Sequence, residues 1–89
     1  MNIKDIKSKF PIFKNKINGK QLVYLDSANS SQKPQTVIEK MSNFYKTEFS
    51  NVGRSVHTLA VRATNRYEET RDKVKSYLNA KHREEIIFT

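Results

Sequence analysis

Two short apolar segments that favour β-strands are separated by two longer segments that favour helices. Residues 22–25 read Leu-Val-Tyr-Leu and residues 85–89 read Glu-Ile-Ile-Phe-Thr, which are compositions typical of strands. A strand needs a neighbour, because an isolated strand pair is barely stable in water. We therefore expect an α/β fold, of which these 89 residues are an N-terminal fragment that stops at the start of a sheet strand.

Apolar periodicity predicts the two helices between these strands. The first covers residues 34–49, because Pro34 suits a first helical turn and an apolar stripe follows it. The stripe is Val37, Ile38, Met41, Phe44, Tyr45 and Phe49, and we interpret it as core or dimer packing. The second helix runs from Thr58, as its N-terminal cap, to Leu78, and Asn79 stops it. Its expected buried side is Ala60, Ala63, Tyr67, Val74 and Leu78, with Tyr77 beside them.

The first residues predict an arm rather than a domain. A short helix reaches Phe10 and ends there, because Pro11 disfavours the helical conformation of the residue before it. We expect an extended stretch from Pro11 to Phe13. A turn at residues 16–20, with Gly19 at its tip, then joins two extended pieces.

The composition limits the kinds of site the chain can form and the cellular compartment in which we expect it. It has no cysteine, so neither a disulfide nor a thiolate metal site can form within it. The first residues lack the apolar stretch of a secretory signal, and no run is long enough to span a membrane. We expect a cytoplasmic protein without membrane association.

The net charge of +8 is the one feature that favours a nucleic-acid ligand. Six lysines lie among the first twenty residues, at positions 4, 7, 9, 14, 16 and 20, against the single acid Asp5. They do not alternate with aromatic residues that could stack on bases. We interpret them as a solvated face, and a small basic nucleic-acid-binding protein is a weaker alternative.

Several short strings, taken in order, carry a family resemblance. The longer ones are Phe-Pro-Ile at 10–12, Leu-Val-Tyr-Leu-Asp-Ser-Ala at 22–28, Gln-Lys-Pro at 32–34, Asn-Val-x-Arg-x-Val-His-Thr-Leu at 51–59 and Glu-Glu-Ile-Ile-Phe-Thr at 84–89. Asn18-Gly19, Ala63-Thr64, Tyr67-Glu68 and Arg71 also match. In this order and spacing the chain resembles the opening of SufS-type cysteine desulfurases, which are class-V aminotransferases. The resemblance covers nearly all of these residues but only the first part of such an enzyme.

The resemblance implies a fold-type I enzyme that uses pyridoxal 5′-phosphate (PLP) and forms a homodimer. It divides the chain into an N-terminal arm, residues 1–15, and the beginning of the large PLP-binding domain, residues 16–89. In this family the lysine that holds PLP, the phosphate-binding turn and the persulfide cysteine all follow the position of Thr89. We therefore expect no catalytic and no cofactor-binding residue here, and PLP only in a full-length protein.

The resemblance also implies substrate-binding residues. Ala28 and Asn29 match the loop after the first strand, whose small residues and free N–H groups lie near the substrate carboxylate. Arg54 matches an arginine near the active site and the subunit interface. Two positions depart from the family pattern: Gly53 stands where the family has histidine, and Ser55 stands where it has glycine.

The remaining candidate side chains have simpler interpretations. His57, beside a helix start, is more often structural than catalytic, and His82 lies in a charged turn that we expect to be solvated. Neither has a partner at metal-ligand spacing, so no metal site is predicted. Asp26 is expected to cap the loop that follows it by bonding backbone N–H groups.

The function implied by the resemblance is removal of sulfur from L-cysteine, which gives L-alanine and an enzyme persulfide. The sulfur would pass to a SufE- or SufU-like acceptor and on to iron–sulfur cluster assembly. We expect this 89-residue chain to be inactive alone. Selenocysteine remains open as a substrate, and a non-catalytic interaction piece or remnant is the alternative to an enzyme.

Overall fold

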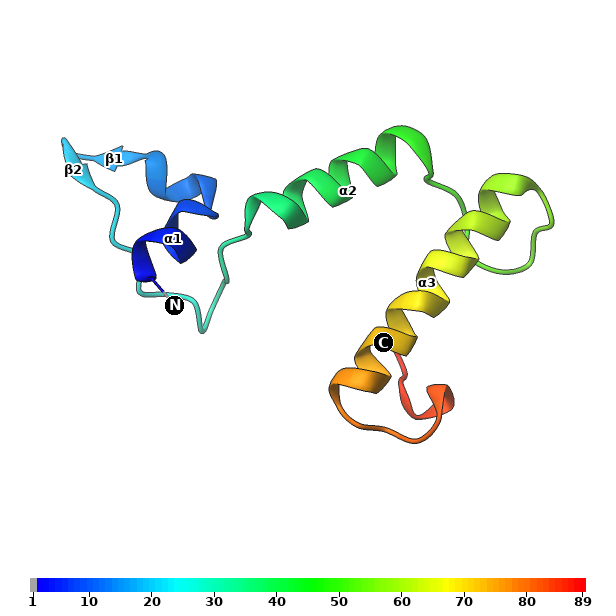
Figure 1. Ribbon diagram of the computed structural model, residues 1–89. Helices are drawn as coiled ribbons and strands as arrows, with labels where there is room; N and C mark the ends of the chain where they lie inside the picture. The colour runs from blue at the N-terminus through cyan, green and yellow to red at the C-terminus, as the bar shows by residue number, and fades with distance from the viewer. Residues whose placement is uncertain (1) are drawn as a thin grey trace. The chain divides into compact units, whose positions relative to one another are not determined.

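The structure, a computed structural model, describes residues 2–89. Contacts group the chain into two compact units, Met1–Asn43 and Phe44–Thr89 (Figure 1). The described residues contain helices and a two-stranded sheet joined by irregular segments, which agrees with the expected mixture of α and β structure. No helix among residues 2–89 has both the length and the apolar character that crossing a membrane requires.

The first unit begins with helix α1, Ile3–Ser8, whose start is capped by Asn2. The Asn2 side chain accepts a hydrogen bond from the backbone N–H of Lys4 at 2.9 Å. The 3-10 helix η1, Pro11–Lys14, follows α1. The expected extended stretch after Pro11 is therefore wrong. A proline at the first helical position has a suitable φ and no N–H to satisfy, so it starts this turn as readily as it ends the one before.

A small hairpin follows, formed by β1, Lys16–Ile17, and β2, Lys20–Gln21. The two strands are antiparallel, with Ile17 opposite Lys20. Asn18 and Gly19 have φ of 52° and 73°, so both lie in the left-handed region that a two-residue hairpin turn of type I′ requires. The predicted turn around Gly19 is confirmed.

The predicted strand at residues 22–25 is not formed. The N–H of Leu22 donates to the carbonyl of Asn15 at 3.3 Å, which extends the hairpin by one bond. Beyond it, Val23 and Leu25 are 72% and 92% exposed and belong to no strand. An extended apolar segment becomes a strand only beside another strand, and no part of residues 2–89 provides one here.

Helix α2, Gln35–Thr47, confirms the first predicted helix, with Pro34 just before it. The N–H of Gln35 donates to the carbonyl of Lys9 at 2.8 Å, which joins the start of α2 to the end of α1. Most of the apolar stripe faces solvent. Five of its members are 42–64% exposed: Val37, Ile38, Met41, Tyr45 and Phe49. The stripe is thus not core in this chain, and dimer packing stays a prediction.

Helix α3, Thr58–Tyr77, confirms the second predicted helix, but its cap is not the predicted residue. His57 is the N-terminal cap and Thr58 is the first helical residue. The Nδ1 of His57 accepts a hydrogen bond from the N–H of Ala60 at 3.2 Å. Threonine was expected because its hydroxyl is a common cap acceptor, but the imidazole nitrogen of His57, one residue earlier, accepts the backbone N–H instead.

The predicted stop of α3 at Asn79 is confirmed. Asn79 has φ of 56°, and the next N–H, of Ala80, donates back to the carbonyl of Lys75 at 2.9 Å. Many helices end in this way, with a left-handed residue followed by a backbone N–H that bonds a carbonyl of the last helical turn. Asparagine adopts the conformation more readily than most residues with a side chain.

The end of the chain does not form the predicted strand. Residues Arg83–Glu85 form the 3-10 helix η2, and residues 86–89 are irregular. In Figure 1 this red segment runs back beside α3, and the rings of Phe88 and Tyr67 meet edge to face at 5.3 Å. As at residues 22–25, no neighbouring strand is available among the described residues. The segment packs on a helix instead.

The buried side chains of the described residues are Ala60, Ala63 and Ile86, all in the second unit. Ala60 and Ala63 confirm the first part of the predicted buried side of α3. Its far end was predicted wrongly, because Tyr77 and Leu78 are 88% and 62% exposed. The core is small, and the polar contacts described below therefore hold much of this unit together.

Candidate functional site

Ala28 and Asn29 lie together in an exposed turn of the first unit. The carbonyl oxygen of Asp26 accepts from the N–H groups of Asn29 and Ser30, at 3.1 and 3.0 Å. The hydroxyl of Tyr24 donates to the carbonyl of Ser30 and closes the turn from its other side. The expectation of a free N–H at Asn29 is therefore wrong, because the turn itself uses that donor.

The capping expectation for Asp26 also needs correction. Its backbone carbonyl, rather than its carboxylate, organises the turn. The turn holds its shape through main-chain bonds and Tyr24, so the exposed side chains of Ala28 and Asn29 remain available to a ligand.

Arg54 lies in the loop between α2 and α3, and its side chain is exposed. It makes no ion pair or side-chain hydrogen bond with any of the residues 2–89. Its φ is 55°, and that of Gly53 is 69°. Within residues 2–89 none of the five guanidinium donors of Arg54 has a partner, and a guanidinium matches a carboxylate in a two-point contact.

Thr64 of α3 holds the Arg54 loop in place. The N–H of Gly53 donates to Thr64 Oγ1 at 2.9 Å, and that hydroxyl donates to the carbonyl of Ala60 at 2.8 Å. Ala60 is fully buried, so the loop is attached to the best-packed part of the unit. Thr64 is among the residues that carry the resemblance, but its role in holding this loop was not predicted from the sequence. The available signal was a hydroxyl four residues after Ala60, on the side of α3 that carries the alanines.

The side chain of Asn51 makes hydrogen bonds inside the Arg54 loop. Its Nδ2 donates to the carbonyl of Gly53 at 3.2 Å and to Ser55 Oγ at 2.8 Å. Ser55, one of the departures from the family pattern, thus supplies an acceptor that glycine lacks. At Gly53 a Cβ would meet nothing within 4 Å, so a residue with a side chain would be opposed there by backbone strain at positive φ rather than by contact of its Cβ.

The two histidines do not form a catalytic or metal-binding group with other residues. His57 caps α3, which agrees with its structural interpretation. His82 is exposed, and its backbone N–H donates to Glu85 Oε2 at 2.9 Å. Residues 2–89 contain no group of three His, Asp or Glu side chains placed to hold a metal ion.

The resemblance in the sequence implies PLP, and the residues present can be compared with what PLP requires. A lysine that forms a Schiff base is typically desolvated, which lowers its pKa. No charged side chain among residues 2–89 is buried, and Lys33, nearest in sequence to the Ala28 turn, donates to the carbonyl of Ser31 at 2.6 Å. The described residues thus do not by themselves form a PLP site.

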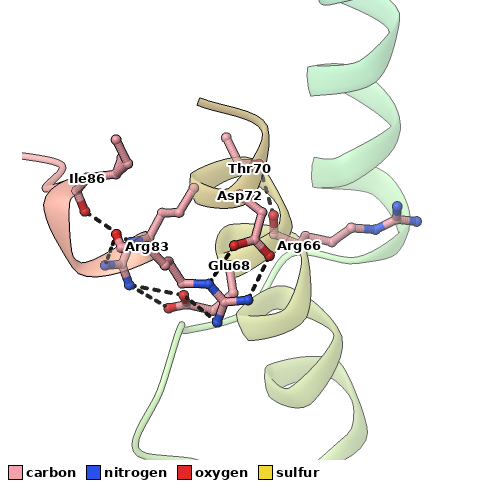
Figure 2. A network of polar contacts seen from close by, with 7 residues as sticks. Arg66, Glu68, Thr70, Asp72, Arg83 and Ile86 are labelled. Carbon is pink, nitrogen blue, oxygen red and sulfur yellow. Dashed lines mark hydrogen bonds and ion pairs between the residues drawn. The ribbon is translucent and has the colours of Figure 1, made fainter. Parts of the chain in front are cut away.

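The strongest electrostatic feature of the second unit is a cluster of ion pairs that attaches η2 to α3 (Figure 2). Arg71 lies at its centre. It contacts Glu68 at 3.0 Å, and it donates to the carbonyls of Ile86 at 3.1 Å and of Arg83 at 3.0 Å. One guanidinium therefore joins α3 to the backbone of the last segment at two points.

Arg83 completes this cluster. It donates to both carboxylate oxygens of Asp72, at 2.7 and 2.6 Å, and lies 3.3 Å from Glu68. The hydrogen bonds from Arg83 hold the pKa of Asp72 below its ordinary value of 3.8. The same bonds raise the pKa of Arg83 above its usual range.

The family model for class-V aminotransferases matches residues 23–89, which is most of the chain and includes the Ala28 turn and the Arg54 loop. The chain belongs to this family. This class-V aminotransferase chain resembles a probable cysteine desulfurase of Halalkalibacterium halodurans, with 49% identity over 100% of the chain. It is 47% identical to a probable cysteine desulfurase of Staphylococcus aureus over 99% of its length. It is 44% identical to a cysteine desulfurase of Pectobacterium atrosepticum over 97% of its length.

The match covers a limited share of those relatives. The chain spans 22% of the Halalkalibacterium protein and 21% of each of the other two. The resemblance found in the sequence strings is confirmed at the level of the family.

Proposed function

We propose that this class-V aminotransferase chain forms part of a PLP-dependent cysteine desulfurase, which converts L-cysteine to L-alanine and an enzyme persulfide. The observation that carries the proposal is the identity of 44–49% to proteins named cysteine desulfurase, or probable cysteine desulfurase, over 97–100% of the chain. The proposed fold is the fold-type I large domain, to which residues 16–89 contribute the beginning and residues 1–15 an arm.

Within that enzyme, the proposed role of this chain is to bind the substrate carboxylate. Arg54 offers a guanidinium that no residue among 2–89 pairs, on a loop held by Thr64. Ala28 and Asn29, in the first unit, form a small exposed turn that we propose as a separate contact to the substrate. A guanidinium and a carboxylate fit in a two-point, charge-assisted contact. PLP, when bound, supplies the electron sink for breaking the carbon–sulfur bond. The chain's own residues bind the substrate carboxylate and orient the substrate.

A chimera tests this function directly. The matching segment of the Pectobacterium atrosepticum desulfurase is replaced by this chain, and release of L-alanine from L-cysteine is measured. We expect turnover, with the KM for cysteine raised by Arg54→Ala and partly restored by Arg54→Lys. Arg62→Ala, an exposed arginine of α3, is the matched control and should leave the KM unchanged. A chimera that binds PLP but releases no alanine would contradict the proposal.

The proposed products indicate the proposed partners. An enzyme persulfide needs a thiol acceptor, and we propose a SufE- or SufU-like protein that carries the sulfur to iron–sulfur cluster assembly in the cytoplasm. Incubation of the chimera with each acceptor should increase alanine release. Selenocysteine as substrate is distinguished by comparing kcat/KM for the two amino acids.

A homodimer is the second part of the proposal, and the apolar stripe from Val37 to Phe49, along α2 and just past its end, supports it. Val37, Ile38, Met41, Tyr45 and Phe49 are 42–64% exposed, and adjacent apolar side chains of this size favour burial. Sedimentation of the chimera should show a dimer, and Met41→Glu should shift it to monomer. An unchanged dimer in that variant would exclude the stripe from the interface.

A further inference from the structure

An open pocket of about 500 Å³ lies in the first unit, where α1, η1 and the hairpin meet. Its lining includes Lys4, Lys7, Lys14, Phe10, Phe13 and Gln21. We refer to these six residues as the lysine pocket. None of these six residues belongs to the Ala28 turn, although Phe10 and Phe13 also line a smaller pocket with Ser27 and Ser31 of that turn.

The charge of the lysine pocket is uncompensated. Lys4 and Lys7 are three residues apart on α1, so they share a face of that helix, and Lys14 comes from η1. No acidic side chain lines the pocket, and none of the three lysines makes an ion pair within residues 2–89. Three neighbouring like charges repel one another, and an anion in the pocket would relieve that repulsion.

The floor of the pocket is aromatic and already ordered. The rings of Phe10 and Phe13 meet edge to face with centroids 6.2 Å apart, and both are partly buried. Gln21 Nε2 donates to the carbonyl of Phe13 at 3.0 Å, which joins the hairpin to η1. These two contacts hold Phe10, Phe13 and Gln21 in place without a ligand, and side chains that are already ordered cost less entropy on binding.

We propose that the lysine pocket binds an acidic segment of a partner protein, in which carboxylates flank an apolar side chain. Lysine ammonium groups are compact point charges without the planar fork of arginine, and they suit carboxylates spaced along a peptide. The apolar side chain would contact Phe10, because Lys7 covers the ring of Phe13. This proposal is independent of the desulfurase activity.

The geometry favours a peptide over a nucleic acid. Binding to a single strand relies on bases stacked on open aromatic faces. Lys7 Nζ lies 5.1 Å from the centroid of the Phe13 ring and covers it, while Phe10 meets Phe13 edge on. The aromatic floor thus offers apolar contact but no open stacking platform.

The experiment uses the 89-residue chain and a fluorescein-labelled peptide, Glu-Glu-Phe-Glu-Glu, with Gln-Gln-Phe-Gln-Gln as the neutral probe. Fluorescence anisotropy measures the Kd. We expect the acidic peptide to bind and the neutral one not to bind, with weaker binding as salt rises from about 50 mM to about 200 mM. The triple variant Lys4→Gln, Lys7→Gln, Lys14→Gln should raise the Kd about tenfold, because each lost surface ion pair contributes modestly.

A variant of equal charge separates the pocket from the general charge of the arm. Lys9→Gln, Lys16→Gln, Lys20→Gln removes the same three charges from residues that do not line the pocket, and it should change the Kd less than about twofold. Replacing the three pocket lysines by arginine should keep binding, and circular dichroism checks that every variant is folded. Equal losses in the two glutamine variants would overturn the proposal. So would tighter binding, through the pocket lysines, of a single-stranded DNA or of phosphatidylglycerol vesicles.

Discussion

Arg83 and Asp72 form a two-point ion pair, with Nε to Oδ1 at 2.7 Å and Nη2 to Oδ2 at 2.6 Å. The pair joins η2 to α3 across eleven residues of sequence. Because the segment that carries Arg83 contributes only Ile86 to the buried core, this contact and those of Arg71 decide whether the end of the chain stays on the helix.

The first prediction concerns pH. Arg83 holds the pKa of Asp72 below 3.8, with Lys75 and Arg71 adding smaller effects. A carboxyl whose pKa is lower in the folded state stabilises the fold fully above its unfolded value, and this contribution is lost as the pH falls through the lowered value. Arg83, whose pKa is raised, stays protonated throughout the acidic range, so it adds no change in stability there. We expect docking of residues 82–88 to be constant from neutral pH down to about 5 and to weaken below 3.8.

The NMR signals of the Phe88 ring, which lies against Tyr67, report this docking. Asp72→Asn should remove most of the pH dependence and speed amide exchange in residues 82–88. Glu69→Gln is the control, since its only ion pair within residues 2–89 is the 3.9 Å contact with Arg66. A wild-type-like pH profile in Asp72→Asn would contradict the prediction.

The second prediction concerns Arg71. Arg71→Lys keeps the charge but loses the planar fork that contacts Glu68 and the carbonyls of Arg83 and Ile86 together. We expect the free energy of unfolding to fall by about 1–2 kcal/mol, the contribution of one or two hydrogen bonds. Urea unfolding followed by circular dichroism measures it. Arg66→Lys, at a half-exposed arginine, should cost less than about 0.5 kcal/mol.

The third prediction concerns the cap of α3. His57→Ala removes the Nδ1 acceptor for the N–H of Ala60 and should destabilise the chain by about 1 kcal/mol. His57→Asp should retain the stability, because aspartate is a strong N-terminal cap and its charge favours a helix start. The same urea experiment measures both variants. Equal stability of the alanine and aspartate variants would refute a capping role.

The fourth prediction concerns Thr64, through which we expect Arg54 to be positioned. Thr64→Val keeps the shape of the side chain but removes the acceptor for the Gly53 N–H, so the Arg54 loop is freed from α3. In the chimera, the KM for cysteine should rise about fivefold, as expected for one hydrogen bond of about 1 kcal/mol. Thr64→Ser should restore it. A change in kcat alone, with no change in KM, would point to a role other than placing Arg54.

Local features of the sequence were enough to predict the helices and the turn. Pro34 and the stripe from Val37 onward located α2, and Asn79 located the end of α3. Gly19 located the hairpin turn. These features act within a few residues, through allowed backbone angles and helical spacing, so a reader of the sequence can recognise them.

The strands were not predictable in the same way. Residues 22–25 and 85–89 have strand composition, yet neither has a partner strand among the described residues. Strand formation depends on hydrogen bonds to a neighbour that the local sequence does not contain. The same limit applies to Thr64, because its bond to Gly53 spans eleven residues and only the folded loop brings the two together.

The sequence by itself determined the family, the two long helices and the residues that stand at the matched positions, Ala28, Asn29 and Arg54. The tertiary structure decided which donors remain free. It used the N–H of Asn29 within the turn and left the guanidinium of Arg54 without a partner among residues 2–89. It bound Arg71 and Arg83 to the end of the chain. A side chain's chemistry is written in the sequence, but its partners depend on which distant segments fold against it.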